Sequence, residues 1–137
     1  WDGYAVARET VLGTARTLDK NLVVLAGDTH NAWANDLADQ EGRAVGVEFA
    51  TASVSSPGFE GVFPNENPVA FARGLETLIG PLLWTDTSQR GFLLVTATAA
   101  ECRAEWRFVS TVLSRQYAAS TGRVLRTLPG QRRLAEV

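Results

Sequence analysis

The chain has 137 residues, of which 45% are hydrophobic and 20% charged, and its formal net charge is −2. This length suffices for one domain with a buried core, and the near-neutral charge favours neither nucleic acid nor an anionic membrane as a partner. No apolar run approaches the roughly 18 residues that a membrane-spanning helix needs. Because the sequence begins at Trp1 and lacks methionine, we expect residues 1–137 to be a single domain within a longer protein.

The first elements in chain order are a helix, a buried strand and a polar loop. Apolar residues recur at helical spacing over residues 3–18, which predicts an amphipathic helix. Residues 22–26 are continuously apolar, as is typical of a short strand buried on both faces. The strand leads directly into a polar loop at residues 27–31. This order is common in α/β proteins that place catalytic groups at the end of a sheet.

A second strand and a second helix are predicted farther along. Residues 43–51 alternate, with Val45, Val47 and Phe49 expected on one face of a strand. A turn-rich stretch follows and continues to Asn67. Asn67 and Pro68 have the residue types of an N-cap and a first helical position, so a helix is expected over residues 68–79.

The last part of the chain predicts an antiparallel strand pair. Residues 92–96 and 102–111 are separated by a short link, and Cys102, Ala104, Trp106 and Phe108 share one face of the second strand. Residues 114–122 are polar and are expected to form a loop, followed by a short strand at 124–128. The tail at 113–137 is otherwise left unassigned. These elements favour an α/β fold, or more broadly α+β, with a mixed sheet and an antiparallel C-terminal pair.

Asp28 and His30 are the candidate metal ligands. They lie two residues apart on the loop after the buried strand, where both side chains can bind one cation. Carboxylate and imidazole together suit zinc, iron or manganese, and carboxylate alone also suits calcium. A turn in which Asp28 accepts backbone hydrogen bonds is the alternative. With one histidine and one cysteine, the chain by itself can complete neither a Cys/His zinc site nor a histidine-rich binuclear site.

A series of motifs in a fixed order resembles the C-terminal region of the PhoD-like alkaline phosphatase/phosphodiesterase family. The motifs are Trp1-Asp2-Gly3-Tyr4, Val23-Val24-Leu25-Ala26-Gly27-Asp28-Thr29-His30, Trp33-Ala34-Asn35-Asp36-Leu37, Gly46-Val47-Glu48-Phe49-Ala50-Thr51, Ser53-Val54-Ser55-Ser56-Pro57-Gly58, Gly91-Phe92-Leu93-Leu94-Val95 and Ala104-Glu105-Trp106. The resemblance spans about residues 1–112.

The resemblance implies part of a calcineurin-like metallophosphoesterase, a two-sheet αββα sandwich. It implies hydrolysis of phosphate monoesters and diesters by a metal-activated water, with iron and calcium as the metals. The metal-ligating Asp and His of the family motif match Asp28 and His30. The family's other ligands belong to an upstream part of the protein, which is therefore an expected partner. Export to the periplasm or the extracellular space is also implied.

Four further residues are candidates for supporting roles. Asn31 and Asn35 are candidates to contact phosphate, although loop capping is the alternative for both. Trp33 is a candidate wall of the substrate pocket, and simple packing is its alternative. Glu48 is a candidate to hydrogen-bond His30 from behind the metal, with a solvated surface position as the alternative.

Two functions from different classes follow from these observations. The first is part of a metal-dependent phosphomonoesterase/phosphodiesterase, with residues 1–137 alone inactive and weakly metal-binding. The second is a non-catalytic packing or interaction module without the upstream ligands. Half of a two-sheet fold would leave an apolar sheet face uncovered, through either Val45, Val47 and Phe49 or Trp106 and Phe108. A homo-oligomer is therefore expected as well.

Overall fold

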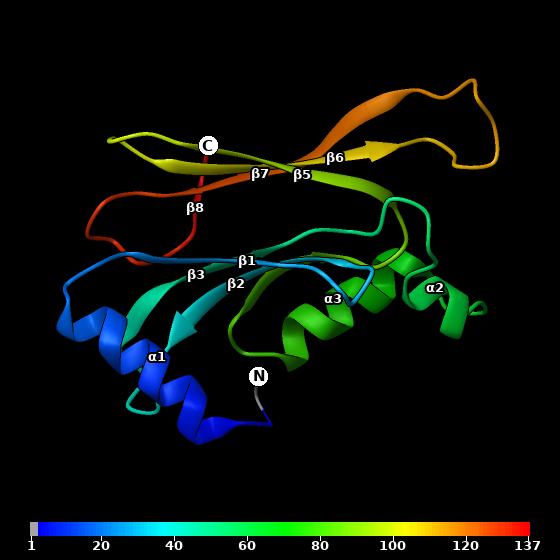
Figure 1. Ribbon diagram of the computed structural model, residues 1–137. Helices are drawn as coiled ribbons and strands as arrows, with labels where there is room; N and C mark the ends of the chain where they lie inside the picture. Colours follow the sequence, from blue (N-terminus) through cyan, green and yellow to red (C-terminus); the bar gives the residue numbers. More distant parts are fainter. Residues whose placement is uncertain (1–2) are drawn as a thin grey trace.

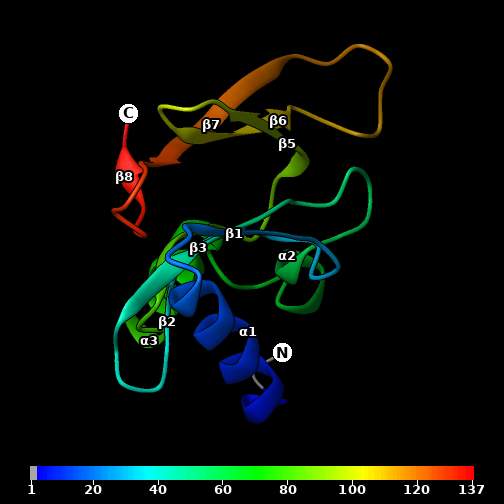
Figure 2. The ribbon, with the colours of Figure 1, turned by 60° about the vertical axis from the view of Figure 1, so that its left-hand side comes forward.

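Two four-stranded β-sheets pack face to face, and helices cover the outer face of one of them (Figures 1 and 2). The computed structural model describes residues 3–137. The first sheet contains β1 (Leu22–Ala26), β2 (Ala32–Ala38), β3 (Ala44–Ala50) and β4 (Leu82–Asp86). The second contains β5 (Arg90–Ala97), β6 (Cys102–Val109), β7 (Ala119–Thr127) and β8 (Ala135–Glu136). The helices are α1 (Ala5–Thr17), α2 (Phe59–Val62) and α3 (Pro68–Leu78).

The first sheet is mixed and the second is antiparallel. The strand order in the first is β1-β3-β2-β4, with β1 parallel to β3 and the remaining pairs antiparallel. The order in the second is β5-β6-β7-β8, and every pair is antiparallel. The predicted α/β two-sheet class, with a mixed sheet and an antiparallel C-terminal pair, is confirmed.

The main core fills the space between the two sheets. Val47 and Phe49 of β3 meet Trp106 and Phe108 of β6 there, and the rings of Phe49 and Trp106 pack edge to face with centroids 5.8 Å apart. The expectation that one of these faces lacks its cover is wrong, because each sheet covers the other. Trp106 and Phe49 are both 0% exposed.

A β-bulge changes the predicted facing of β3. Leu37 pairs with Gly46 and Ala38 with Ala44, so Val45 is the extra residue of β3. The bulge puts Val45 on the helix side, in contact with Leu12 of α1, whereas Val47 stays between the sheets. The prediction that Val45 shares a face with Val47 is therefore wrong.

Several other elements differ from the sequence prediction. The strands β2, β4 and β8 and the short helix α2 are not predicted, and β7 begins at Ala119 within the segment expected to be a loop. A second bulge lies at Gly122 of β7, because Trp106 pairs with Arg123 and Arg107 with Thr121. Helix α3 agrees with the prediction, and its N-cap Asn67 accepts a hydrogen bond from the backbone of Ala70.

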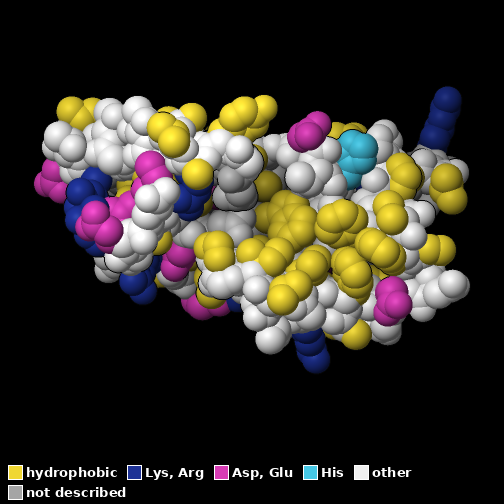
Figure 3. Space-filling model, turned by 90° about the horizontal axis from the view of Figure 1, so that it is seen from below, with side chains coloured by type: hydrophobic (Ala, Val, Ile, Leu, Met, Phe, Trp, Pro, Cys, Tyr) yellow, Lys and Arg dark blue, Asp and Glu magenta, His cyan; other side chains and the backbone are white. Residues whose placement is uncertain are grey.

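The face that carries the helices also exposes apolar side chains. Figure 3, which views the molecule from below, shows hydrophobic side chains gathered toward its right-hand part, where Figure 1 places α2 and α3. Val69 and Leu78 of α3 are 61% and 81% exposed. Among the described residues 3–137, no helix is long and apolar enough to span a membrane.

Candidate metal centre

The loop with the predicted ligands lies where the parallel strands β1 and β3 both end. Hydrogen bonding continues beyond the two strands, because the Thr51 amide donates to the Ala26 carbonyl over 3.0 Å. The loop that follows β1 and the segment that follows β3 therefore meet at one edge of the sheet. Such an edge is the usual location of ligand sites in α/β proteins.

The backbone at Asp28 forms a γ-turn. The Thr29 amide donates a 2.8 Å hydrogen bond to the Gly27 carbonyl, and the central residue Asp28 has φ of +69°. A γ-turn with a positive central φ is the rarer and more strained of the two forms. His30 follows with φ of +62°, also in the left-handed region. Two strained non-glycine residues on one short loop are typical of functional sites.

His30 is anchored by a residue from the segment after β3. Its ring atom Nδ1 lies 3.0 Å from the carbonyl oxygen of Pro57. The His30 backbone carbonyl also accepts a hydrogen bond from the Ser53 amide, over 3.4 Å. Asp28 and His30 are both exposed, so their side chains can meet a ligand from outside the described chain.

Asn31 is buried at the base of the loop, with only 1% of its surface exposed. Its Nδ2 donates to the Thr29 carbonyl over 2.6 Å, and its Oδ1 accepts from the Phe59 amide over 3.0 Å. These are the bonds of a loop anchor, which was the alternative to its predicted contact with phosphate. That contact stays a prediction.

Trp33 supports the same loop from β2. Its indole Nε1 donates to the Thr29 hydroxyl over 2.7 Å, and its ring packs edge to face on Phe59 with centroids 6.0 Å apart. Thr29 is thus held by both Asn31 and Trp33. The predicted role of Trp33 as a pocket wall stays a prediction.

Asn35 and Glu48 form a cross-strand pair in the first sheet. They are register partners in β2 and β3, and the Asn35 amide donates to the Glu48 carboxylate over 3.0 Å. The pair lies within the strands rather than on the loop. The bond of His30 Nδ1 is to Pro57, so the predicted support of His30 by Glu48 stays a prediction.

The donor set fits part of a metal centre. Asp28 offers carboxylate oxygens and His30 a ring nitrogen, both from one loop. In the described part of the chain, residues 3–137, no three side chains of His, Cys, Asp or Glu gather as a potential metal site. Structural and catalytic sites for such metals use about four to six ligands, so two donors fit only as a fraction of a set.

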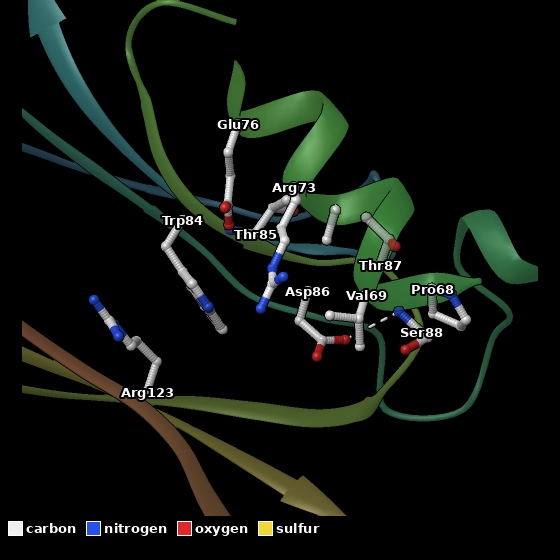
Figure 4. Close-up of a pocket in the computed structure, with 11 residues that line it drawn as sticks. Pro68, Val69, Arg73, Glu76, Trp84, Thr85, Asp86, Thr87, Ser88 and Arg123 are labelled. Atoms are coloured by element: carbon white, nitrogen blue, oxygen red, sulfur yellow. Dashed lines mark hydrogen bonds between the residues drawn. The ribbon is translucent and has the colours of Figure 1, made fainter. Parts of the chain in front are cut away.

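A separate cleft of about 420 Å³ lies between α3, β4 and β7 (Figure 4). Arg73 of α3 and Arg123 of β7 line it together with the acidic side chains of Glu76 and Asp86. The two cations are balanced by the two carboxylates, so the cleft carries no excess positive charge for a phosphate. Neither predicted metal ligand lines it.

Burial also affects two titratable groups that are not part of the loop. It raises the pKa of the Cys102 thiol, which disfavours the reactive thiolate form. This agrees with the position of Cys102 beside the core. Burial also lowers the pKa of Arg90, the first residue of β5.

The chain thus has a two-sheet α/β fold with an Asp-x-His loop at the ends of its parallel strands. Residues 1–106 match the family of PhoD-like phosphatases, and the chain belongs to that family. It is 28% identical over 128 residues to "Alkaline phosphatase D" of Bacillus subtilis (strain 168). A solved structure described as "Structure of PhoD" shares the fold, with a TM-score of 0.78 and 24% sequence identity.

The chain spans about a quarter or less of the length of these relatives. The alignment with the Bacillus protein covers 88% of this chain and 21% of that protein. The structural match covers 100% of this chain and 26% of the other.

Sequence reasoning missed four residues that support the loop. The Pro57 carbonyl contacts His30, the Gly58 amide donates to the Glu60 carboxylate, and Glu60 pairs with Arg90. The turn-rich family motif that ends in Pro57-Gly58 was the sequence feature that could have indicated this support. The bond from His30 to a main-chain carbonyl has no signature in the side-chain pattern.

Proposed function

We propose that Asp28 and His30 are metal ligands of a PhoD-like alkaline phosphatase/phosphodiesterase that hydrolyses phosphate monoesters and diesters. The observation that carries the proposal is the strained loop after β1, which presents an exposed carboxylate and an exposed imidazole at the sheet edge. Membership of the family supports it. The expected metals are iron and calcium.

The two ligands have different roles in this proposal. Asp28 brings a negative charge and hard oxygen donors, which both iron and calcium accept. His30 brings a neutral nitrogen donor, which suits iron better than calcium. When bound, such cations polarise phosphoryl oxygens and make water a stronger nucleophile. Trp33 and Asn35 are proposed to contact the ester, and the strands hold both in fixed positions.

The remaining ligands come from the upstream part of the longer protein. Since the chain spans 21% and 26% of its relatives, most of their length is available to supply them. Residues 1–137 alone are therefore expected to bind metal weakly and to lack activity. Export from the cytoplasm is part of the same proposal.

The test is the double variant Asp28→Ala/His30→Ala in the full-length protein. We expect bound metal, measured by mass spectrometry of the digested protein, to fall together with hydrolysis of p-nitrophenyl phosphate and bis-p-nitrophenyl phosphate. The circular dichroism spectrum should be unchanged. Glu41→Ala is the matched control, because Glu41 is an exposed carboxylate on the β2–β3 turn.

The opposite result would favour the non-catalytic module. If the double variant keeps its metal and its esterase activity, Asp28 and His30 are not ligands. Residues 1–137 would then serve packing or interaction only.

A further inference from the structure

We propose that Asn31 is a positioning residue that clamps the Asp28–His30 loop onto residues 57–59 and thereby fixes the tautomer of His30. The clamp holds His30 with its proton on Nδ1 and leaves Nε2 free to bind metal. This inference rests on the proposed function for the role of Nε2. The tautomer itself does not depend on it.

The tautomer follows from the chemistry of the His30 partner. Nδ1 of His30 lies 3.0 Å from the carbonyl oxygen of Pro57, a main-chain oxygen that can only accept a hydrogen bond. Nδ1 must therefore carry the proton. In a neutral imidazole the proton is then absent from Nε2, which keeps its lone pair. Histidine ligands in metal sites are commonly oriented by such a bond from the other ring nitrogen.

Asn31 connects the two segments that this bond joins. Its Nδ2 bonds to Thr29 on the ligand loop, and its Oδ1 bonds to the Phe59 amide, two residues beyond Pro57. The Asn31 side chain is only 1% exposed, so water cannot readily replace either bond. Loss of the amide would free the ligand loop from the segment that carries the Pro57 carbonyl.

Gly58 lets the two segments approach this closely. A Cβ at Gly58 would lie 2.4 Å from Asn31 Oδ1 and 2.8 Å from the Thr87 carbonyl oxygen, so only glycine fits. The Gly58 amide also donates to the Glu60 carboxylate, over 3.1 Å to its Oε2. Glu60 pairs with the half-buried Arg90 at the start of β5. The clamp is thereby fastened to the second sheet.

The single histidine makes the tautomer measurable without assignment ambiguity. The experiment is ¹⁵N NMR of the metal-free 137-residue chain with labelled histidine, at a pH where an ordinary imidazole is neutral. We expect His30 to show a protonated Nδ1 and an unprotonated Nε2, the reverse of the form that free histidine favours. A predominantly Nε2-protonated His30 would overturn the proposal.

Variants of Asn31 test the clamp itself. Asn31→Ala should return His30 toward the tautomer mixture of free histidine. Asn31→Asp should do the same, because it keeps the acceptor for the Phe59 amide but turns a carboxylate oxygen toward the Thr29 carbonyl oxygen, which needs a donor. Asn67→Ala is the matched control, because it removes an asparagine that caps α3 and does not contact the ligand loop. If Asn31→Ala fails to fold, Gly58→Ala takes its place, since it forces the same segments apart. An unchanged tautomer in a folded Asn31→Ala or Gly58→Ala variant would contradict the role of Asn31.

Metal affinity separates this inference from the proposed function. In the full-length protein, Asn31→Ala should weaken metal binding about 10–100-fold, the usual effect of losing an outer-shell partner. Suppose that the wild-type chain shows the Nδ1–H tautomer but the full-length Asp28→Ala/His30→Ala variant keeps its metal. That result would refute the proposed function and leave the clamp intact. If instead that variant loses its metal and the wild-type chain has its proton on Nε2, the result would refute the clamp alone.

Discussion

The indole Nε1 of Trp106 donates a buried 2.8 Å hydrogen bond to the carbonyl oxygen of Ala50. The bond links β6 of the second sheet to the last residue of β3, next to the edge that carries the candidate metal loop. Trp106 also packs against Phe49 and Trp84, with ring centroids 5.8 and 4.9 Å away. This one side chain thus joins the two sheets through both apolar contact and a directed bond.

Trp106→Phe should lower the free energy of unfolding by about 2–4 kcal/mol, because it leaves the Ala50 carbonyl without its donor and also leaves a small cavity. Urea denaturation measures the loss. Trp84→Phe is the matched control, since Trp84 is only partly buried against the same core. Equal losses in the two variants would show that the hydrogen bond to Ala50 adds little.

The extent of successful prediction follows from how strongly each segment is patterned. The continuous apolar run at residues 22–26 predicted β1 with the bounds that the structure has. The prediction that this strand is buried on both faces is wrong, because β1 lies at the edge of its sheet and Leu25 is 60% exposed. The strand β2 was missed because its core positions are the small residues Ala32 and Ala34, which carry a weak hydrophobic signal. The bulge at Val45 was also unpredictable from alternation. One inserted residue leaves the alternating sequence pattern unchanged, yet it moves the Val45 side chain to the opposite face of the sheet.

The site was predictable only in its side chains. The spacing of Asp28 and His30 and the family resemblance placed both on one loop, where the structure has them. The partner of His30 lies 27 residues away and is a backbone carbonyl. A carbonyl is common to every residue, so no residue type in the sequence could point to it.

Gly46→Ala should destabilise the protein severely, by more than about 4 kcal/mol, which is the range of exceptional single substitutions. A Cβ at Gly46 would lie 2.1 Å from the Leu22 carbonyl oxygen, and hydrogen-bonded backbone atoms of a sheet cannot move away to relieve the clash. Gly74→Ala in α3 is the matched control, because its Cβ would meet nothing within 4 Å. That change should stabilise by about 0.5–1 kcal/mol, since alanine loses less freedom in a helix. Thermal unfolding of both variants checks the contrast, and a mild effect at Gly46 would contradict the close β1–β3 approach.

Asp39 should make stability depend on acid pH. Burial by itself raises the pKa of Asp39, but hydrogen bonds from Arg43 and Glu41 and the charge of Arg43 hold that pKa below its ordinary value. Because the folded pKa is the lower one, the stabilisation is complete above the ordinary value of about 3.9 and is lost as the pH falls through the folded value.

The measurement is the urea midpoint of wild type and Asp39→Asn at neutral pH and at several points below about pH 4. The advantage of wild type should be largest at neutral pH and should shrink in acid. Glu41→Gln removes an exposed carboxylate that pairs with the same Arg43, and its difference from wild type should change much less. An advantage of wild type over Asp39→Asn that does not vary with pH would contradict the lowered pKa of Asp39.

Substitutions at Asp28 should separate backbone strain from metal binding. At φ of +69° glycine is unstrained and a β-branched residue is strongly disfavoured. We therefore expect stability to rise by about 0.5–1 kcal/mol in Asp28→Gly and to fall by about 1–2 kcal/mol in Asp28→Val. Both variants should lose metal affinity in the full-length protein, because each lacks the carboxylate.

The neighbouring Thr29 is the control, since it is not among the residues with positive φ in the described chain. There Thr29→Val and Thr29→Gly both remove the hydroxyl that accepts from Trp33. At Thr29 the glycine variant should then be the less stable of the two. If glycine is the less stable variant at Asp28 as well, the loop at Asp28 stores no strain.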